Sequence, residues 1–333
     1  MGFPVKAVKH LGLAIGFFGL LLVPGLAISH YFVSGAASVF VFGALPAAAA
    51  YFGGAPRAAL PAIGLSVISG SLAYAFRDQS VLSALLMATV AVIIGLSARR
   101  GLSSPILIVG MNLGFLILSP QELKSSNQVF TAGALLALGG IWAVAVSALV
   151  RKRLKPSAAT GSKSLRVIIP YALSLGISTG LATYFLMVYA PGGVGAWLVL
   201  TIFVVLKPDT SATISKTRDR ILGTIAGAII AFIAIEMLAF LGLNHGGVQL
   251  TIALLFMGAS MAYFVQGPYW LFVLLLTPGM VLLDSNNVND QISVDEWRVA
   301  YTIIGVALAL SVAYSLHLLT TLLLRKREIT QDQ

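Results

Sequence analysis

The chain is a succession of long apolar runs separated by short polar or basic loops, and this pattern constrains its fold more than any other feature. A helix that crosses a bilayer needs about 20 predominantly apolar residues. Hydrophobic residues make up 58% of the 333 residues and charged residues only 10%, too few polar side chains to cover a water-soluble protein. The sequence therefore predicts an all-α membrane protein with about twelve transmembrane helices and no large soluble domain.

The candidate spans are the apolar runs that lie between charges or turn residues. Their predicted bounds are 9–29, 31–53, 58–76, 80–98, 102–119, 128–150, 167–189, 193–206, 220–242, 249–265, 269–284 and 298–324. The run at 193–206 is short for a span and is flanked by glycines. The first run follows Lys6 and Lys9 like a signal peptide, but its length and the spans after it predict an uncleaved first helix.

The distribution of basic residues predicts the orientation of these spans. If the spans alternate, all of the 21 Lys and Arg except Arg77, Lys124 and Arg298 fall on one side of the membrane. Basic residues accumulate on the cytoplasmic side of membrane proteins. The sequence therefore predicts an even number of spans, with both termini cytoplasmic and with those three residues on the external side.

A basic, Pro/Ser/Gly-containing linker at 151–166 divides the chain into two six-helix halves, 1–150 and 167–325, followed by a cytoplasmic tail at 326–333. A shift of 166 positions lays 101–119 on 267–285, with the first glycine and the last serine of each segment in register. Because six crossings return the chain to its starting side, the two halves are expected to be repeats with the same orientation.

Several classes of protein are disfavoured by what the sequence lacks. There is no cysteine, so disulfides, thiolate metal sites and cysteine nucleophiles are excluded. The nucleotide-binding pattern G-x-x-x-x-G-K-[ST] is absent. The net charge of +10 sits in loops between apolar runs rather than on a basic face with stacking aromatics, which argues against nucleic-acid binding. No cofactor or metal is expected.

The most informative motif opens the ninth apolar run. Arg218 and Arg220 lie where a helix start would meet the headgroups, and fixed positive charges at such a boundary attract anionic substrate or lipid. Gly223, Thr224 and Gly227 follow, and two glycines four residues apart form a face on which another helix can approach closely. The motif predicts helix packing at the glycines and substrate contact at Arg218, Arg220 and Thr224, with simple packing and anchoring as the alternative.

A Pro-Asp loop followed by Arg-x-Arg-Ile-Leu-Gly-Thr-x-x-Gly, as it stands here up to Gly227, resembles the signature of the fusaric acid resistance and aromatic acid exporter family. The resemblance implies two six-helix halves and efflux of small aromatic or amphipathic anions across a bacterial inner membrane. It also implies a periplasmic adaptor of the membrane-fusion type and a role in drug resistance. The larger members carry a substantial cytoplasmic domain, where this sequence shows only the linker at 151–166 and a brief tail, and Arg57 before Gly64 is the nearest trace of the motif in the first half.

A second candidate translocation site lies at paired helix breaks. Asn112 stands at mid-membrane depth between two glycines, and the 166-residue shift aligns it with Pro278, which Thr277 and Gly279 flank. Interrupted helices expose backbone N–H and C=O groups that can hold a substrate. A simple kink or a close helix contact is the alternative.

Isolated polar residues within the other runs give further candidates. Glu236 lies deep in the ninth run, where a carboxyl group is expected to face the bundle interior, a partner or water, and it is the candidate for proton coupling. The alternative is that the Glu236 side chain reaches the external membrane–water interface. Tyr171 and Ser174, with Ser178, form a hydroxyl stripe that could line a substrate path or bond between helices. His317 is expected to be a packing residue.

These features predict a secondary active exporter of small organic anions, driven by protons and working with a periplasmic adaptor. Membrane lipids, the anionic substrate and a second copy of the chain are the other expected partners. A passive organic-anion channel is the nearest alternative. A membrane scaffold or an intramembrane enzyme is the alternative from another class, although no pair of His, Asp or Glu at membrane depth has acid–base or metal spacing.

Overall fold

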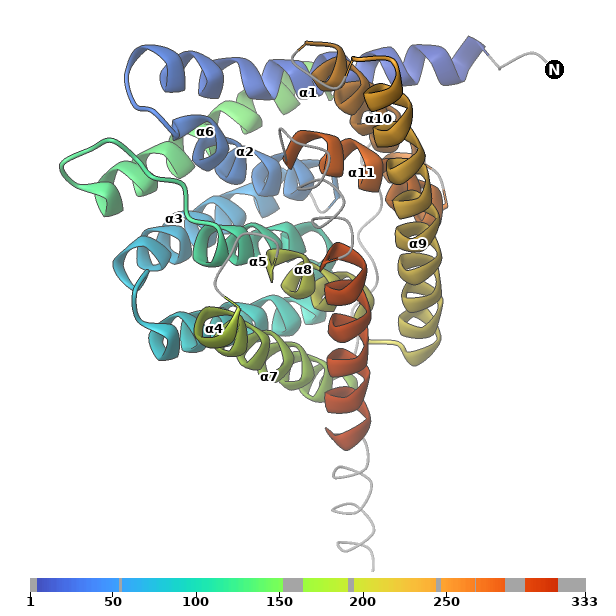
Figure 1. Cartoon of the computed structure of the whole chain (residues 1–333). Helices are drawn as coiled ribbons and strands as arrows, with labels where there is room; N and C mark the ends of the chain where they lie inside the picture. Colours follow the sequence, from blue (N-terminus) through green and yellow to red (C-terminus); the bar gives the residue numbers. More distant parts are fainter. Residues whose placement is uncertain are drawn as a thin grey trace, which may run out of the picture. The chain divides into compact units, whose positions relative to one another are not determined.

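The computed structural model describes residues 5–53, 56–151, 164–190, 195–243, 247–266, 268–284 and 297–316, and these ranges contain helices, short turns and no strand (Figure 1). The α-helices are α1 (Val5–Tyr31), α2 (Ala36–Gly53), α3 (Ala59–Ala75), α4 (Ser80–Ser97), α5 (Ser103–Leu118), α6 (Gln128–Val150), α7 (Leu165–Tyr189), α8 (Ala196–Val205), α9 (Thr210–Phe240), α10 (Gly247–Gln266), α11 (Tyr269–Asp284) and a last helix over Trp297–Leu316. The all-α prediction is confirmed.

Each predicted apolar run coincides with a helix, and the bounds of α6 and α11 agree with the prediction to the residue. The largest difference is in α9, which begins at Thr210 although the predicted span begins at Arg220. The prediction counted apolar residues only. The ten residues before Arg220 contain neither glycine nor proline, so the helix continues through this polar segment.

Seven of the described helices are long and apolar enough to cross a membrane. The helices α5 and α11 have 16 residues each and α8 has ten, which gives α8 a length of only about 15 Å. Every residue of α8 except Leu200 is buried. A short helix that is apolar and buried all round lies inside a helical bundle rather than against lipid.

The chain forms two compact packing units. Unit 1 comprises Met1–Val23 and Ser211–Ile304, and unit 2 comprises Pro24–Thr210 and Gly305–Gln333. These units are defined by packing, whereas the predicted halves 1–150 and 167–325 are defined by repetition and stay a prediction. The starts of α5 and α11 lie 166 residues apart, which matches the predicted shift.

Glycines bring the helices of unit 2 close together. In α4 and α7, Gly95 lies against Ala172 and Gly180 against Ala88, so these two helices run antiparallel. In α5 and α8, Gly110 lies against Phe203 and Gly114 against Val199, which is also an antiparallel pair. Both pairs run in the relative direction expected when successive helices of the chain alternate in direction.

The helices of unit 1 follow the same rule. Gly223 of α9 lies beside Trp270 of α11 and Gly227 beside Thr277, so α9 and α11 run parallel. The intervening α10 is antiparallel to α11, because the Gln249 side-chain amide donates to the carbonyl oxygen of Leu282 over 2.7 Å while Ala253 of α10 lies against Gly279. The three helices therefore run forward, back and forward again.

Candidate functional site

The buried face of α9 carries an arginine. Buried positions recur every three or four residues along the helix, as expected for one face of an α-helix. They include Thr213, Arg220, Thr224, Ala231 and Leu238. Arg220 is only 1% exposed, so a permanently charged guanidinium is held inside the packed part of unit 1.

Arg220 contacts the first residue of α11. Its Nη1 lies 3.5 Å from the hydroxyl oxygen of Tyr269, at the long limit of a hydrogen bond. The Lys216 ammonium, one helical turn before Arg220, lies 4.2 Å from the centre of the Tyr269 ring. A cation at this distance from an aromatic ring is attracted by its π-face. Tyr269 is therefore in contact with two cations from α9.

A second buried arginine lies close enough to Tyr269 for its charge to act on that residue. Arg298, at the start of the last helix, is 1% exposed, and its charge acts on Tyr269 together with those of Arg220 and Asp219. We call Lys216, Arg220, Tyr269 and Arg298 the basic cluster. Besides Lys216 over the ring, the charges among the described residues that act on Tyr269 are those of Arg220, Arg298 and the Asp219 carboxylate.

Arg298 was predicted as the first residue of the last span, at its external end, and the structure places it in a helix. The charge pattern predicted a side of the membrane for Arg298 but gave no sign of its burial. Arg298 lies in the described helix Trp297–Leu316 and is buried within unit 1. Its predicted side of the membrane stays a prediction.

The structure separates the two arginines of the motif. Arg218 is exposed and lies 3.7 Å from the neighbouring carboxylate of Asp219, whereas Arg220 is buried. Two residues apart on a helix, side chains point about 200° apart. The predicted start of the helix at Arg220 is wrong, because Arg220 lies ten residues inside α9, whereas its place at the headgroups stays a prediction.

The glycines of the motif lie where α9 meets α11. A Cβ on Gly223 would stand 2.6 Å from the carbonyl oxygen of Trp270, and one on Gly227 would stand 2.8 Å from that of Leu274. Pro278 has no N–H with which to pair the Leu274 carbonyl four residues earlier. The missing side chain of Gly227 thus lets α9 approach the carbonyl that Pro278 leaves without its usual helical donor.

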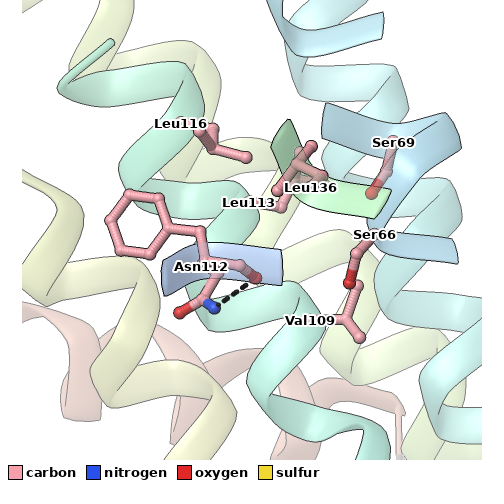
Figure 2. A pocket seen from close by; sticks show the side chains of 8 residues that line it. Ser66, Ser69, Val109, Asn112, Leu113, Leu116 and Leu136 are labelled. Atoms are coloured by element: carbon pink, nitrogen blue, oxygen red, sulfur yellow. Dashed lines mark hydrogen bonds between the residues drawn. The ribbon is translucent and has the colours of Figure 1, made fainter. Parts of the chain in front are cut away.

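The predicted helix breaks are not observed. The helix α5 continues through Asn112, and α11 continues through Pro278. The Asn112 side chain donates a hydrogen bond of 3.0 Å to the carbonyl oxygen of Phe42 in α2, in a small apolar pocket that Ser66 also lines (Figure 2). A single polar residue or proline does not unwind a helix when neighbouring helices enclose it.

The remaining residues of the predicted helix breaks have packing partners. The Thr277 hydroxyl donates to the carbonyl oxygen of Val273 over 2.9 Å within α11. A Cβ on Gly279 would stand 3.0 Å from the Ala253 carbonyl oxygen of α10. Together with Gly227, these residues pack α11 between its two neighbours, and their contact with a substrate stays a prediction.

Other predicted residues lie away from the basic cluster. Tyr171 and Ser174 of α7 are buried within unit 2. Glu236 is exposed on α9, next to the exposed side chains of Ile233 and Met237, so it does not face the interior of unit 1, and its predicted contact with a partner or water stays a prediction. His317 and the linker residues 152–163 lie outside the described residues. The structure therefore brings together only the α9 and α11 candidates.

Sequence reasoning missed Lys216, Tyr269 and Arg298 as site residues. Lys216 could have been found, because it lies four residues before Arg220 and thus on the same helical face. Tyr269 and Arg298 each stand at the start of an apolar run. Nothing in their local sequence pairs them with α9, and only the packing of the helices does so.

This arrangement defines an all-α, multi-pass membrane protein. A model of the family described as fusaric acid resistance protein-like matches residues 177–312, which include α8 to α11 and the basic cluster. Residues 177–312 are therefore similar to this family, in agreement with the resemblance that the motif predicted. The family and the apolar helices together support a membrane transporter-type role.

The chain is also similar to the uncharacterized protein slr1298 of Synechocystis sp. (strain ATCC 27184 / PCC 6803 / Kazusa). The two are 31% identical over 127 residues, which is 36% of this chain. The match spans only 15% of that relative's length. No solved structure matches the chain.

Proposed function

We propose that the chain is a secondary active exporter of small aromatic or amphipathic organic anions in a bacterial inner membrane, driven by protons and working with a periplasmic adaptor. The observation that carries the proposal is the basic cluster. Two arginines of unit 1 that are each 1% exposed act on the tyrosine with which α11 begins. Charged side chains within membrane helices are costly and mark transport pathways by default.

The chemistry of the cluster fits a carboxylate attached to an apolar body. A guanidinium offers a planar fork of donors that can bind both oxygens of a carboxylate. The Tyr269 ring offers a face for an aromatic or aliphatic group. Tyr269 is also the first residue of α11, and the N-terminus of a helix favours negative charge. The guanidinium and the helix N-terminus favour an anion, and the ring favours its apolar body.

Thr224 supplies a further donor beside Arg220. It is 1% exposed, and its Oγ1 has no hydrogen-bond partner among the described residues. Buried hydroxyl groups normally have a partner. A substrate carboxylate close to Arg220 would provide the missing acceptor, which supports the predicted role of Thr224 in substrate contact.

A passive anion channel is the second candidate function. The observation that favours it is the exposed position of Glu236, which separates the candidate proton-coupling carboxyl from the buried face that carries Arg220. A channel would need the same basic cluster for selectivity but no titrating group. The two functions differ in whether the anion can move against its gradient.

The test is uphill transport by the purified protein in proteoliposomes. When a pH gradient is imposed, benzoate should accumulate against its concentration gradient faster than in protein-free liposomes under the same gradient, and this protein-dependent part should be lost when a protonophore is added. Benzoate flux that only equalises the two concentrations would replace the exporter with the channel. No protein-dependent benzoate flux in either mode would remove the proposal for aromatic carboxylates.

The first prediction concerns Glu236. The substitution Glu236→Gln should abolish uphill transport and leave downhill exchange within about twofold, because the amide keeps the shape of the side chain but cannot bind and release a proton. Flux measured with and without a pH gradient separates the two modes. Full uphill export by the Gln variant would exclude Glu236 as the coupling group.

The second prediction concerns topology. Reporter proteins fused at Ser157 in the linker and at Gln333 should both report a cytoplasmic position, because the basic residues of both segments favour that side. A fusion at Lys124 should report the opposite side. An external signal from Ser157 or Gln333 would overturn the proposed twelve crossings.

A further inference from the structure

Unit 2 contains a pocket that none of the predicted site residues line. Its volume is about 370 Å³, within the range of about 300–1,000 Å³ typical of small-molecule sites. It lies where α3, α5 and α7 end and α4 begins. Its lining residues are Arg77, Asp78, Ser80, Ile117, Leu118, Pro120, Leu186, Met187 and Val188. The predicted topology places this end of unit 2 on the external side of the membrane.

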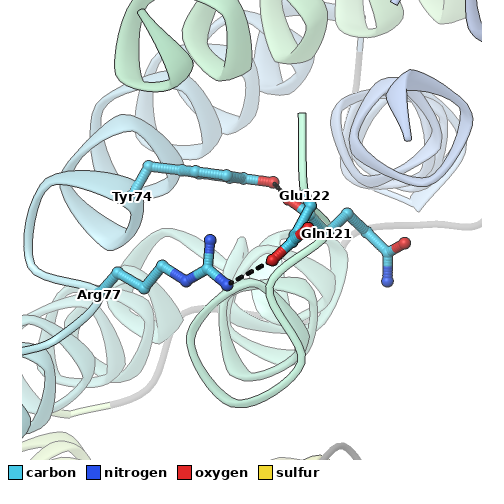
Figure 3. A network of polar contacts seen from close by, with 4 residues as sticks. All are labelled: Tyr74, Arg77, Gln121 and Glu122. Carbon is cyan, nitrogen blue, oxygen red and sulfur yellow. Dashed lines mark hydrogen bonds and ion pairs between the residues drawn. The ribbon is translucent and has the colours of Figure 1, made fainter. Parts of the chain in front are cut away.

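One rim of the pocket is held in place by polar contacts (Figure 3). The Tyr74 hydroxyl donates a hydrogen bond of 2.9 Å to the carbonyl oxygen of Gln121, which fixes the loop between α5 and α6. Leu123 of the same loop is 1% exposed. Arg77 lies 3.8 Å from the carboxylate of Glu122 in this loop. The pocket is therefore preformed.

The lining combines two adjacent opposite charges with an apolar wall. A purely anionic ligand would be attracted by Arg77 and repelled by Asp78, and a purely cationic ligand would meet the reverse. A ligand that carries both charges is attracted by both side chains. Leu186 and Val188 of α7, with Ile117 of α5, offer an apolar surface beside them.

We propose that this pocket binds a zwitterionic amphiphile. Its anionic group pairs with Arg77, its ammonium group pairs with Asp78, and its apolar part lies against Ile117 and the end of α7. Two sources share this chemistry: an aminophospholipid of the phosphatidylethanolamine type and a free amino acid with an apolar side chain. The inference does not depend on the proposed export of anions.

Glu122 is the competitor for Arg77. Its side chain is 85% exposed, and its separation of 3.8 Å from Arg77 is long for a charge-assisted hydrogen bond. Exposed ion pairs of this kind contribute little to stability, so a ligand can displace the carboxylate readily. Removal of the Glu122 charge should therefore strengthen ligand binding, whereas removal of the Arg77 or Asp78 charge should weaken it.

The test is equilibrium binding to the purified full-length protein in detergent. Four soluble probes distinguish the classes of ligand: dihexanoyl-phosphatidylethanolamine, dihexanoyl-phosphatidylglycerol, phenylalanine and phenethylamine. At least one zwitterion should bind, and at least about tenfold more tightly than the phosphatidylglycerol and phenethylamine probes, because like-charge juxtaposition is costly. Preference for the phosphatidylethanolamine probe identifies a lipid site, and preference for phenylalanine identifies an amino acid site.

The variants give effects of opposite sign on the same probe. Arg77→Gln and Asp78→Asn should each weaken binding of the preferred zwitterion at least tenfold, and Glu122→Gln should strengthen it. The matched control is Arg57→Gln, an exposed arginine outside the pocket. Equal affinity for zwitterion and phosphatidylglycerol, unchanged binding in both Asp78→Asn and Arg77→Gln, or no binding of either zwitterion would overturn the proposal.

Discussion

Replacement of Arg220 by glutamine is expected to lower benzoate flux at least about tenfold, whereas Arg218→Gln should leave it within about twofold. Arg220 is buried beside Tyr269, while Arg218 is exposed and paired with Asp219. In the proposed complex Arg220 pairs with the substrate carboxylate, and loss of one partner of such a buried charge pair typically costs about 2–5 kcal/mol, where each 1.4 kcal/mol is about tenfold. Exposed charged side chains such as Arg218 contribute far less to the interaction free energy.

Arg218→Gln is a matched control, because the same substitution two residues away removes the same formal charge from the same helix. Membrane insertion and the elution profile of the purified protein should be normal in both variants. Arg220→Lys should retain part of the flux, since it keeps the charge but loses the planar fork of donors. Benzoate flux at the wild-type rate in both Gln variants would leave both arginines as topology anchors.

Replacement of Gly227 by leucine is expected to prevent correct folding. Even a Cβ at this position would lie 2.7 Å from the Cβ of Thr277 and 2.8 Å from the Leu274 carbonyl oxygen, so a leucine would force α9 away from α11. Overpacking of a close contact typically costs about 1–3 kcal/mol or more. The yield of monodisperse protein and its thermal midpoint in detergent measure the effect.

Gly64→Leu in α3 is the control for this substitution, because a Cβ there would meet nothing within 4 Å. This variant should keep a normal yield and thermal midpoint. If Gly227→Leu behaved like Gly64→Leu, the close contact between α9 and α11 would not exist in the folded protein.

The helices could be predicted from the sequence because apolar runs of the right length have few alternatives in a bilayer. Every backbone N–H and C=O must be satisfied within the segment, which leaves the helix as the structure of each run. The start of α9 was missed for the same reason. The rule counts apolar residues, and the helix extends ten residues beyond them, from Thr210 to Asp219.

The candidate site was predictable only in its α9 part. The spacing of Gly223 and Gly227 indicates a packing face without any structure. The contact of Arg220 with Tyr269, 49 residues away, depends on the parallel packing of α9 and α11, which no local pattern encodes. Asn112 and Pro278 were interpreted as helix breaks because the sequence does not show the neighbours that enclose them.

The charge selectivity of transport tests the central claim, that the basic cluster moves organic anions. Proteoliposomes that contain the purified protein should be supplied separately with benzoate, benzamide and benzylamine, which share a ring and differ in charge. Benzoate should cross at a rate that depends on the protein and on Arg220, and benzylamine should not. Protein-dependent transport of benzylamine or benzamide at the rate of benzoate, unaffected by Arg220→Gln, would contradict the claim.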